Sequence, residues 1–352
     1  MKKKFVLLFG LVLLLYTVQA KPIISFFNEL QTPALVKLFQ DSTLIPSLQK
    51  LQAEIRMGIM DLTPERAAIV RKLNQAGIPV IACLMLPMED GSKAIERYIA
   101  TKKWAADNQL NFKGIGIGLE FDKNDAKLIK ENTGKWIRKI PGRLYGKSVM
   151  EDAREQYANL IKMIKADGYF SESYYVPFIK DEIAANRSAL QLVTRLTAIK
   201  TDREIPLLYS SYFGFGDGLI QVYGFDANVK YVVLGTTARG DTTYTKSGIL
   251  EYEELIRDID IAAKKMEEIH ISNLEGCVEN GYLSKLLEHQ YDSTLVINQE
   301  EVTDIKEIRD NFQTASKILS YPTLILLIMA IILGLFAWLI VFIIRKIIAF
   351  IS

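Results

Sequence analysis

The sequence predicts an α/β fold in which eight parallel strands, each followed by a helix, close into a barrel of the TIM or (β/α)8 type. Short β-rich runs alternate with amphipathic helical stretches through the middle of the chain, a pattern that requires parallel strands joined by right-handed crossovers. Eight such runs can be counted, the number that closes a parallel sheet on itself. No glycine-rich phosphate loop opens any of the helical stretches, which weakens the alternative of an open, doubly wound sheet.

The strands are predicted where β-branched and aromatic residues cluster. Their ranges are 22–27, 54–62, 78–86, 114–122, 174–182, 205–213, 231–237 and 269–278. The helix after the second strand has the clearest ends, because Thr63 suits an N-cap, Pro64 suits the first turn and Gly77 suits a C-terminal stop. Together these elements place the barrel at residues 21–289.

The N-terminal end has the layout of a secretory signal peptide. Three lysines precede an uncharged stretch at 5–16, and Val18-Gln19-Ala20 forms a small-residue cleavage pattern. The uncharged stretch is too short to span a bilayer comfortably. Residues 1–20 are therefore predicted to be a signal peptide, with an uncleaved N-terminal anchor as the alternative.

The C-terminal end predicts a membrane anchor. Residues 324–344 form a run of 21 residues without a charge, and two basic residues follow at once. At about 1.5 Å per residue a helix of this length crosses a hydrocarbon core, and the positive-inside tendency places the basic tail in the cytoplasm. We therefore expect a polar stalk at 290–320, a transmembrane helix at 321–344 in contact with the lipid bilayer, and a cytoplasmic tail at 345–352. The bulk of this single-pass membrane protein would then lie outside the cytoplasm, in a periplasm or in the extracellular space.

The part between the two ends carries little net charge. Five of the 43 basic residues lie outside 21–320, which leaves 38 basic against 41 acidic residues in that part. A nucleic-acid-binding domain usually has an excess of basic residues, so this balance argues against nucleic acid as a partner. Cys83 and Cys277 are the only cysteines, and each lies in an apolar run. Two buried free thiols are expected rather than a disulfide, since paired cysteines need closely matched geometry.

Acidic residues and tyrosines follow several of the predicted strands. In a parallel barrel the carboxyl ends of the strands form the working face, so these side chains are expected to meet there. The carboxylates are Asp61, Glu120, Asp122, Asp181, Glu182 and Glu275, and the tyrosines are Tyr209 and Tyr212. For each carboxylate alone, a solvated strand end or a helix N-cap is the alternative.

Histidine chemistry is not expected at this face. His270 and His289 are the only histidines, and neither falls at the carboxyl end of a predicted strand. This argues against a histidine base and a histidine-ligated zinc, and no cofactor is predicted. Paired carboxylates at a barrel mouth suit the cleavage of glycosidic bonds, and they also suit a divalent metal site of the kind used by sugar isomerases.

The fourth predicted strand has a glycine at every second position. Gly114, Gly116 and Gly118 share one face with Glu120, while the apolar residues between them point to the outer helices. We expect these glycines to leave the barrel hollow below Glu120. The alternative is that bulky side chains from neighbouring strands fill the space.

Residues 112–121, FKGIGIGLEF, resemble the strand-four motif of the chitinase-type (family 18) glycoside hydrolases. The two aromatic residues, the first glycine, the isoleucines and the glutamate match, and the resemblance implies that Glu120 is the general acid. The three aspartates of that motif fall on Lys113, Gly116 and Gly118, so the substrate-assisted route of the family lacks its orienting aspartate. The resemblance therefore supports a glycosidase-like barrel more than the hydrolysis of chitin.

The sequence thus predicts a membrane-anchored, outward-facing barrel of the glycoside hydrolase type that acts on a carbohydrate. Glu120 is its predicted acid, with Glu182 or Glu275 as the second catalytic carboxylate. The predicted substrate-binding residues are Asp61, Asp122, Asp181, Tyr209 and Tyr212. A non-catalytic barrel that binds a glycan or a protein at the cell surface is the alternative, and a metal-dependent sugar-converting enzyme is a further one.

Overall fold

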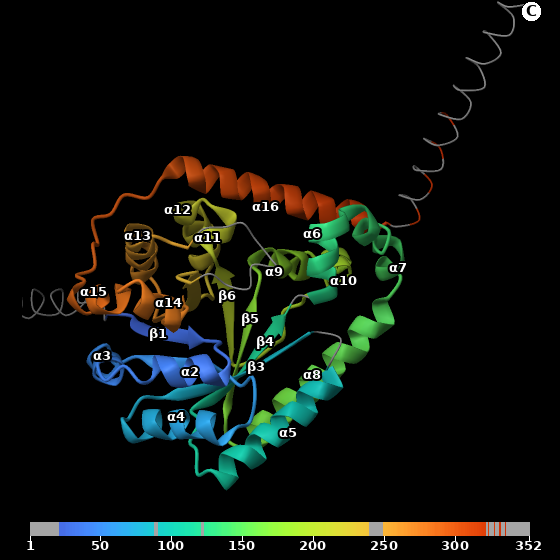
Figure 1. The fold of residues 1–352 in the computed structure, drawn as a ribbon. Helices are drawn as coiled ribbons and strands as arrows, with labels where there is room; N and C mark the ends of the chain where they lie inside the picture. The colour runs from blue at the N-terminus through green and yellow to red at the C-terminus, as the bar shows by residue number, and fades with distance from the viewer. Residues whose placement is uncertain are drawn as a thin grey trace, which may run out of the picture.

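The structure is a computed structural model of the 352-residue chain, and it describes residues 21–87, 91–120, 123–238 and 249–321 with four single positions beyond. Within these ranges the chain forms a closed barrel of eight parallel strands in the order β1 to β8 (Figure 1). The prediction of a TIM-type barrel is confirmed. The strands are β1 Ile23–Asn28, β2 Glu54–Gly58, β3 Val80–Pro87, β4 Gly114–Glu120, β5 Phe170–Tyr175, β6 Arg203–Leu208, β7 Tyr231–Gly235 and β8 Glu268–Ser272.

Helices surround the barrel and connect its strands (Figure 1). They are α2 Thr32–Leu38, α3 Leu44–Lys50, α4 Pro64–Gln75, α5 Gly91–Asp107, α6 Lys123–Ile137, α7 Ile140–Leu144, α8 Lys147–Ala166, α9 Pro177–Ala184, α10 Ala189–Thr194, α11 Ser210–Phe213, α12 Gly216–Leu219, the π-helix η2 Ile220–Gly224, α13 Tyr252–Ala263, α14 Leu274–Glu279, α15 Tyr282–Glu288 and α16 Gln299–Leu319. The helix expected after the second strand is α4, and the side chain of Thr63 caps it by accepting from the backbone N–H of Arg66.

The alternation of side chains along the strands builds two apolar cores. Outward residues such as Phe26, Ile55 and Ile115 pack with the helices in the main core. The smaller core fills the barrel interior and consists of Phe27, Ile81, Cys83, Tyr174, Ile205 and Val233. Both cysteines are buried and free, as expected.

The glycines of β4 do face the interior, but they do not leave the barrel hollow. A Cβ on Gly116 would lie 2.7 Å from the hydroxyl oxygen of Tyr174, and a Cβ on Gly118 would lie 2.7 Å from the terminal methyl of Met85. Large side chains from β5 and β3 occupy the space that the glycines open. The prediction of a hollow interior is therefore wrong, and its alternative of close packing is confirmed.

A network of buried charges, which was not predicted from the sequence, lies near the amino ends of the strands. Arg56 is fully buried, and its guanidinium contacts Glu268 at 2.7 Å, Glu172 at 3.1 Å and Glu54 at 3.4 Å. Arg203 adds a second contact to Glu268 at 3.1 Å. Burial alone would lower the pKa of Arg56, but the charges of Glu172 and Glu268 raise it above its ordinary value. Each buried charge in this network has a partner, as the low dielectric of the interior requires.

The fifth strand ends earlier than predicted. β5 ends at Tyr175, and α9 begins at Pro177, where the fixed φ of proline suits the first turn of a helix. The predicted strand at 174–182 is therefore correct only at residues 174 and 175, and β5 begins earlier, at Phe170. Asp181 and Glu182 lie on α9 and not at a strand end.

The last described helix packs on the barrel. α16 crosses the loops that follow β5 and β6 and contacts α9, α10 and α12 (Figure 1). Val302 and Ile305 are buried in the main core, and the ring of Phe312 stacks on Phe178 of α9 with centroids 4.4 Å apart. Much of the segment predicted as a stalk at 290–320 is thus a packed helix.

In the described ranges the chain has no helix that is both long enough and apolar enough to cross a membrane. The prediction of a single-pass membrane protein with its bulk outside the cytoplasm is corrected on this finding. The predicted signal peptide at 1–20, most of the predicted span at 324–344 and the predicted tail at 345–352 lie outside the described residues.

Candidate functional site

The mouth of the barrel, the end formed by the carboxyl ends of the strands, brings two carboxylates together. Glu29 directly follows β1 and is exposed, and its place in the alternation is that of Phe27, which faces the interior. Glu275 lies in the first turn of α14, just beyond β8. Because β1 and β8 are neighbours in the closed barrel, the backbone N–H of Glu29 can donate to the carboxylate of Glu275.

Glu275 is almost completely removed from water. Its exposed fraction is 7%, and burial, together with the negative charge of Glu29, raises its pKa to about 7. Three hydrogen bonds act in the opposite direction, from its own backbone N–H, from the backbone N–H of Glu29 and from Nδ2 of Asn28 at 2.9 Å. At neutral pH the carboxyl group is therefore near half protonation, where one group can both accept and donate a proton.

Asn28 is the last residue of β1, and its side chain is fully buried. Its Nδ2 donates to Glu275, whereas its Oδ1 has no hydrogen-bond partner within the described parts of the chain. Asn273, which directly follows β8, also has an amide oxygen for which those parts offer no partner. A buried acceptor left unpaired costs about 1–3 kcal/mol, so each oxygen favours the approach of a donor.

Two tyrosines at the end of β6 complete the mouth. Tyr209 follows β6 and Tyr212 lies in α11, and their rings meet edge to face with centroids 5.5 Å apart. The Tyr209 hydroxyl is hydrogen-bonded to Ser272 at the end of β8, and the Tyr212 hydroxyl to Thr236 after β7. Burial, and after it the charge of Glu29, raises the pKa of both hydroxyl groups, so both stay protonated and able to donate.

The structure thus brings three of the predicted site residues to the mouth, namely Glu275, Tyr209 and Tyr212. Asn28 and Glu29 were missed, because the first strand was predicted to stop at residue 27. The rule applied to the other strands, that polar residues just beyond a strand reach the working face, would have found both.

Asp61 links α2 to α4 and does not line the mouth of the barrel. Its carboxylate accepts hydrogen bonds from the hydroxyl groups of Thr32 at 2.7 Å and Thr63 at 2.8 Å, and it pairs with Arg66 at 3.2 Å. Burial alone would raise the pKa of Asp61, but these bonds lower it below its usual range. They join the starts of α2 and α4.

Asp181 and Glu182 are bonded to other helices. Asp181 pairs with Arg309 of α16 at 2.5 Å. Glu182 accepts hydrogen bonds from the backbone N–H of Leu190 at 2.6 Å and from the hydroxyl of Ser316 at 2.5 Å. These contacts hold α9, α10 and α16 together.

Two further predicted residues cannot be placed. The backbone of Glu120 ends β4 at the mouth, but its side chain and the whole of Asp122 lie outside the described residues. In the ranges that the structure covers, no group of three or more histidine, cysteine, aspartate or glutamate side chains could hold a metal ion.

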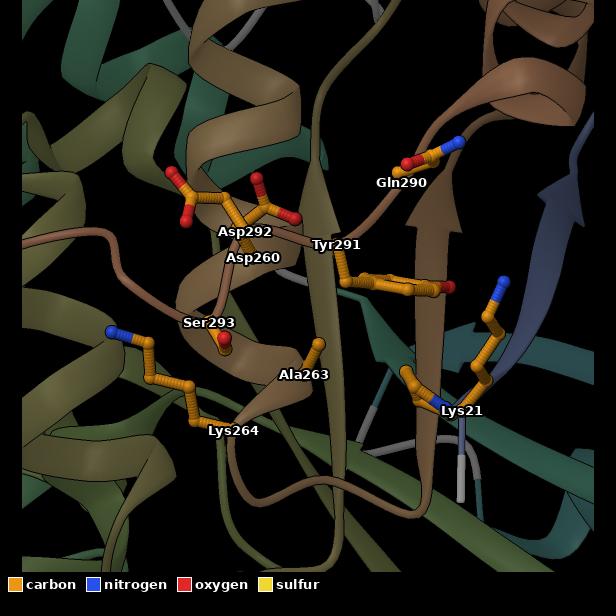
Figure 2. Close-up of a pocket in the computed structure, with 9 residues that line it drawn as sticks. Lys21, Asp260, Ala263, Lys264, Gln290, Tyr291, Asp292 and Ser293 are labelled. Atoms are coloured by element: carbon orange, nitrogen blue, oxygen red, sulfur yellow. The ribbon is translucent and has the colours of Figure 1, made fainter. Parts of the chain in front are cut away.

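A cavity of about 440 Å³ lies at the opposite end of the barrel (Figure 2). Its lining includes Lys21 just before β1, Asp260 on α13 and the segment 290–293, and the ring of Tyr291 forms one wall beside Lys21. Asp260 is paired with His289 at 2.7 Å. Lysines and aspartates are equal in number here, so the cavity favours neither an anion nor a cation, and no site is assigned to it.

No protein-family profile and no curated protein sequence matches the chain. Solved structures with a similar fold include an L-ribulose 3-epimerase, with 11% identity, a TM-score of 0.39 and coverage of 85% of this chain and 98% of that one. The 3-keto-D-glucoside 4-epimerase YcjR from E. coli has 13% identity, a TM-score of 0.44 and coverage of 76% and 99%. A xylose isomerase domain protein from Planctomyces limnophilus has 10% identity, a TM-score of 0.42 and coverage of 76% and 96%.

The prediction of a glycoside hydrolase is not retained. None of these three structures is of a glycoside hydrolase. In addition, Glu182, one of the two predicted partners of Glu120, is bonded to α10 and α16. The other predicted partner, Glu275, lies at the mouth beside Glu29.

Proposed function

We propose that the barrel is a sugar-converting enzyme that moves a proton at its mouth through Glu275, with Glu29 as the second carboxylate. The observation that carries this proposal is the state of Glu275, which is almost buried, has a pKa of about 7 and lies beside a second carboxylate. A carboxyl group with a strongly raised pKa at the carboxyl ends of barrel strands is a mark of acid–base chemistry.

The ligand class follows from the groups that the mouth offers. The carboxylates of Glu29 and Glu275 and the free amide oxygens of Asn28 and Asn273 are acceptors, which suit the hydroxyl donors of a polyhydroxylated molecule. Tyr212 is 37% exposed, and a partly exposed ring is a surface on which the C–H face of a sugar can stack. A small sugar with a free carbonyl satisfies both features.

These groups support proton transfer at a carbon next to the carbonyl. Glu275 in its carboxylate form takes the proton from that carbon, and the electron pair of the broken C–H bond moves toward the carbonyl oxygen. The hydroxyl of Tyr209 or Tyr212 donates a hydrogen bond to this oxygen as its charge grows. Return of this proton to the neighbouring carbon, with the hydroxyl proton there moving to the former carbonyl oxygen, gives an isomer. An epimer forms when Glu29 in its protonated form donates from the opposite face, and Glu275 then keeps the proton that it took. The conversion consumes no oxidant or reductant.

Proton exchange in D2O tests this proposal without knowledge of the substrate. The full chain is incubated with a panel of free aldoses and ketoses, and ¹H NMR follows deuterium uptake at the carbon next to the carbonyl and the appearance of new isomers. We expect exchange with at least one sugar, and a loss of at least about a hundredfold in Glu275→Gln, since general acid–base groups contribute about 10²–10⁴-fold.

Glu279→Gln is the matched control, because Glu279 lies on the same helix and is exposed. The Glu279→Gln variant should catalyse deuterium exchange at the rate of the wild-type chain. The proposal is wrong if no sugar in the panel exchanges, or if Glu275→Gln exchanges as fast as Glu279→Gln.

A further inference from the structure

The segment between β4 and the body of α8 is the most basic stretch of the barrel. We call residues 123–149 the basic arm; they comprise α6, α7 and the start of α8. The arm contains eight basic and two acidic residues, whereas the whole of 21–320 has a small excess of acidic ones. Its positive charge is therefore local and not a property of the barrel as a whole.

The arm holds itself together with one of its two acidic residues. Asp125 is fully buried and pairs with Lys139 at 3.0 Å and with Arg143. Arg143 also donates to the backbone carbonyl of Val193 at 2.7 Å, which ties the arm to α10. Burial alone would raise the pKa of Asp125, but these cations lower it. These ion pairs fix the shape of the arm and use two of its cations, and Lys147 pairs with Glu151 at 3.6 Å.

The outer part of the arm is almost entirely exposed. Every residue from 131 to 139 is exposed except Trp136, which is half-buried. Lys127, Lys135 and Arg138 are exposed and form no ion pair within the described residues. Unpaired cations on a protruding surface attract an anionic partner.

Apolar side chains stand among these cations. Ile137, Tyr145 and Val149 are 52%, 56% and 45% exposed. A purely polyanionic partner would bind the cations but would make no favourable contact with exposed apolar side chains. A membrane surface of anionic headgroups and acyl chains can contact both the cations and the apolar side chains. Figure 1 shows that α6 and α7 lie together at one edge of the molecule, so the arm can reach a flat surface.

We propose that the basic arm docks the barrel on an anionic lipid surface, with its lysines and arginines over the headgroups and Ile137, Tyr145 and Val149 at the level of the first acyl carbons. In this contact the barrel lies on the membrane surface and does not cross the bilayer. The residues involved differ from those of the transmembrane helix predicted at 321–344. It is independent of the proposed enzymatic function.

Vesicle binding of the full chain tests this inference. Binding is measured to vesicles of phosphatidylcholine with one third phosphatidylglycerol and to vesicles of pure phosphatidylcholine. The ratio of the two binding constants removes any binding that does not depend on the anionic lipid. We expect a ratio well above one that falls with added salt. Reversal of two charges in Lys135→Glu/Arg138→Glu should lower the ratio by at least about tenfold, since each cation near an anionic surface contributes about 1 kcal/mol.

Two further variants separate lipid docking from other kinds of binding. Ile137→Ser/Tyr145→Ser should weaken binding to the anionic vesicles severalfold and leave the salt dependence unchanged. Lys37→Glu/Lys50→Glu, on the exposed faces of α2 and α3, is the matched control and should keep the wild-type ratio to within about twofold after allowance for net charge. The inference fails if the control lowers the ratio as much as the arm reversal does. It also fails if Ile137→Ser/Tyr145→Ser binds the vesicles like wild type, because the partner is then a polyanion of another class.

Discussion

Nδ2 of Asn28 donates to Oε2 of Glu275 at 2.9 Å, and this bond joins the end of β1 to the first turn of α14. It crosses the seam at which the barrel closes, since β1 and β8 are the first and last strands. The bond stabilises the charged form of Glu275, whereas burial and the charge of Glu29 favour the protonated form. Asn28 therefore opposes the effect of burial and makes it easier for Glu275 to give up its proton.

Asn28→Ala should raise the pKa of Glu275 further. The loss of one hydrogen bond to a carboxylate, worth about 1 kcal/mol, corresponds to an upward shift of roughly 0.7 pH units. The shift is measured by ¹³C NMR titration of the glutamate carboxyl groups, with the Glu275 signal assigned from its absence in Glu275→Gln. Gln75→Ala, at an exposed amide on α4, is the control and should leave the midpoint in place.

The raised pKa of Glu275 also predicts how its contribution to stability depends on pH. The group holds its proton more tightly in the folded chain than in the unfolded one, so its contribution is fully present below pH 4.5 and is lost as the pH rises toward 7. The difference in unfolding free energy between wild type and Glu275→Gln should therefore move by about 3 kcal/mol in favour of the variant between pH 4 and pH 8. Urea unfolding at both pH values measures it, and a difference that does not change with pH would contradict the assigned pKa.

Gly116→Ala should destabilise the barrel by about 1–3 kcal/mol, because its Cβ would lie 2.7 Å from the hydroxyl oxygen of Tyr174 and 2.8 Å from the sulfur of Cys83. Tyr174→Phe removes that oxygen, so the double variant should recover part of the loss attributed to Gly116→Ala. Gly142→Ala is the control, since the described residues place no atom within 4 Å of the added Cβ apart from the local backbone of the same helix, and it should be neutral or slightly stabilising. Denaturant unfolding of the variants provides the comparison, in which equal effects at both glycines would refute the packing argument.

Arg56→Met should cost about 3–5 kcal/mol at neutral pH, because three buried carboxylates lose their shared cation. Removal of Arg56 raises the pKa values of these carboxyl groups in the folded chain, so the variant is favoured by protonation. Its deficit relative to wild type should therefore be smaller at pH 5 than at pH 8, as measured by urea unfolding. A deficit that grows toward low pH would show that the network is not held by charge.

The barrel class could be predicted from the sequence because β-rich runs and amphipathic helices alternate, and this pattern does not depend on tertiary contacts. The buried charge network could not be predicted from the sequence. The strands EIRMG and EIHIS alternate polar with apolar residues, and FSESYY has three polar residues in a row. Such polar residues usually indicate a strand face exposed to water, but the inner face of a closed barrel is buried.

The candidate site was predictable in part for a similar reason. Strand parity placed Glu275 at the mouth although it lies on a helix, because that helix, α14, begins only two residues after the end of β8. Asp181 and Glu182 were misplaced because the aromatic run before Pro177 hides the start of a helix. Which carboxylate is bonded to a distant helix, as Glu182 is to α16, depends on contacts between residues more than a hundred positions apart.

The ion network inside the barrel has a bearing on how this chain can change over evolutionary time. Its six members carry equal and opposite charge: Arg56, Lys113 and Arg203 against Glu54, Glu172 and Glu268. Arg56 and the three glutamates are buried, so a single replacement among these four leaves an unbalanced charge in the interior, and we expect a descendant that loses one of them to lose a counterpart as well. Relatives of this chain should therefore keep these six residues or abandon them in balanced pairs, which would make the set a marker of descent even where little other identity remains.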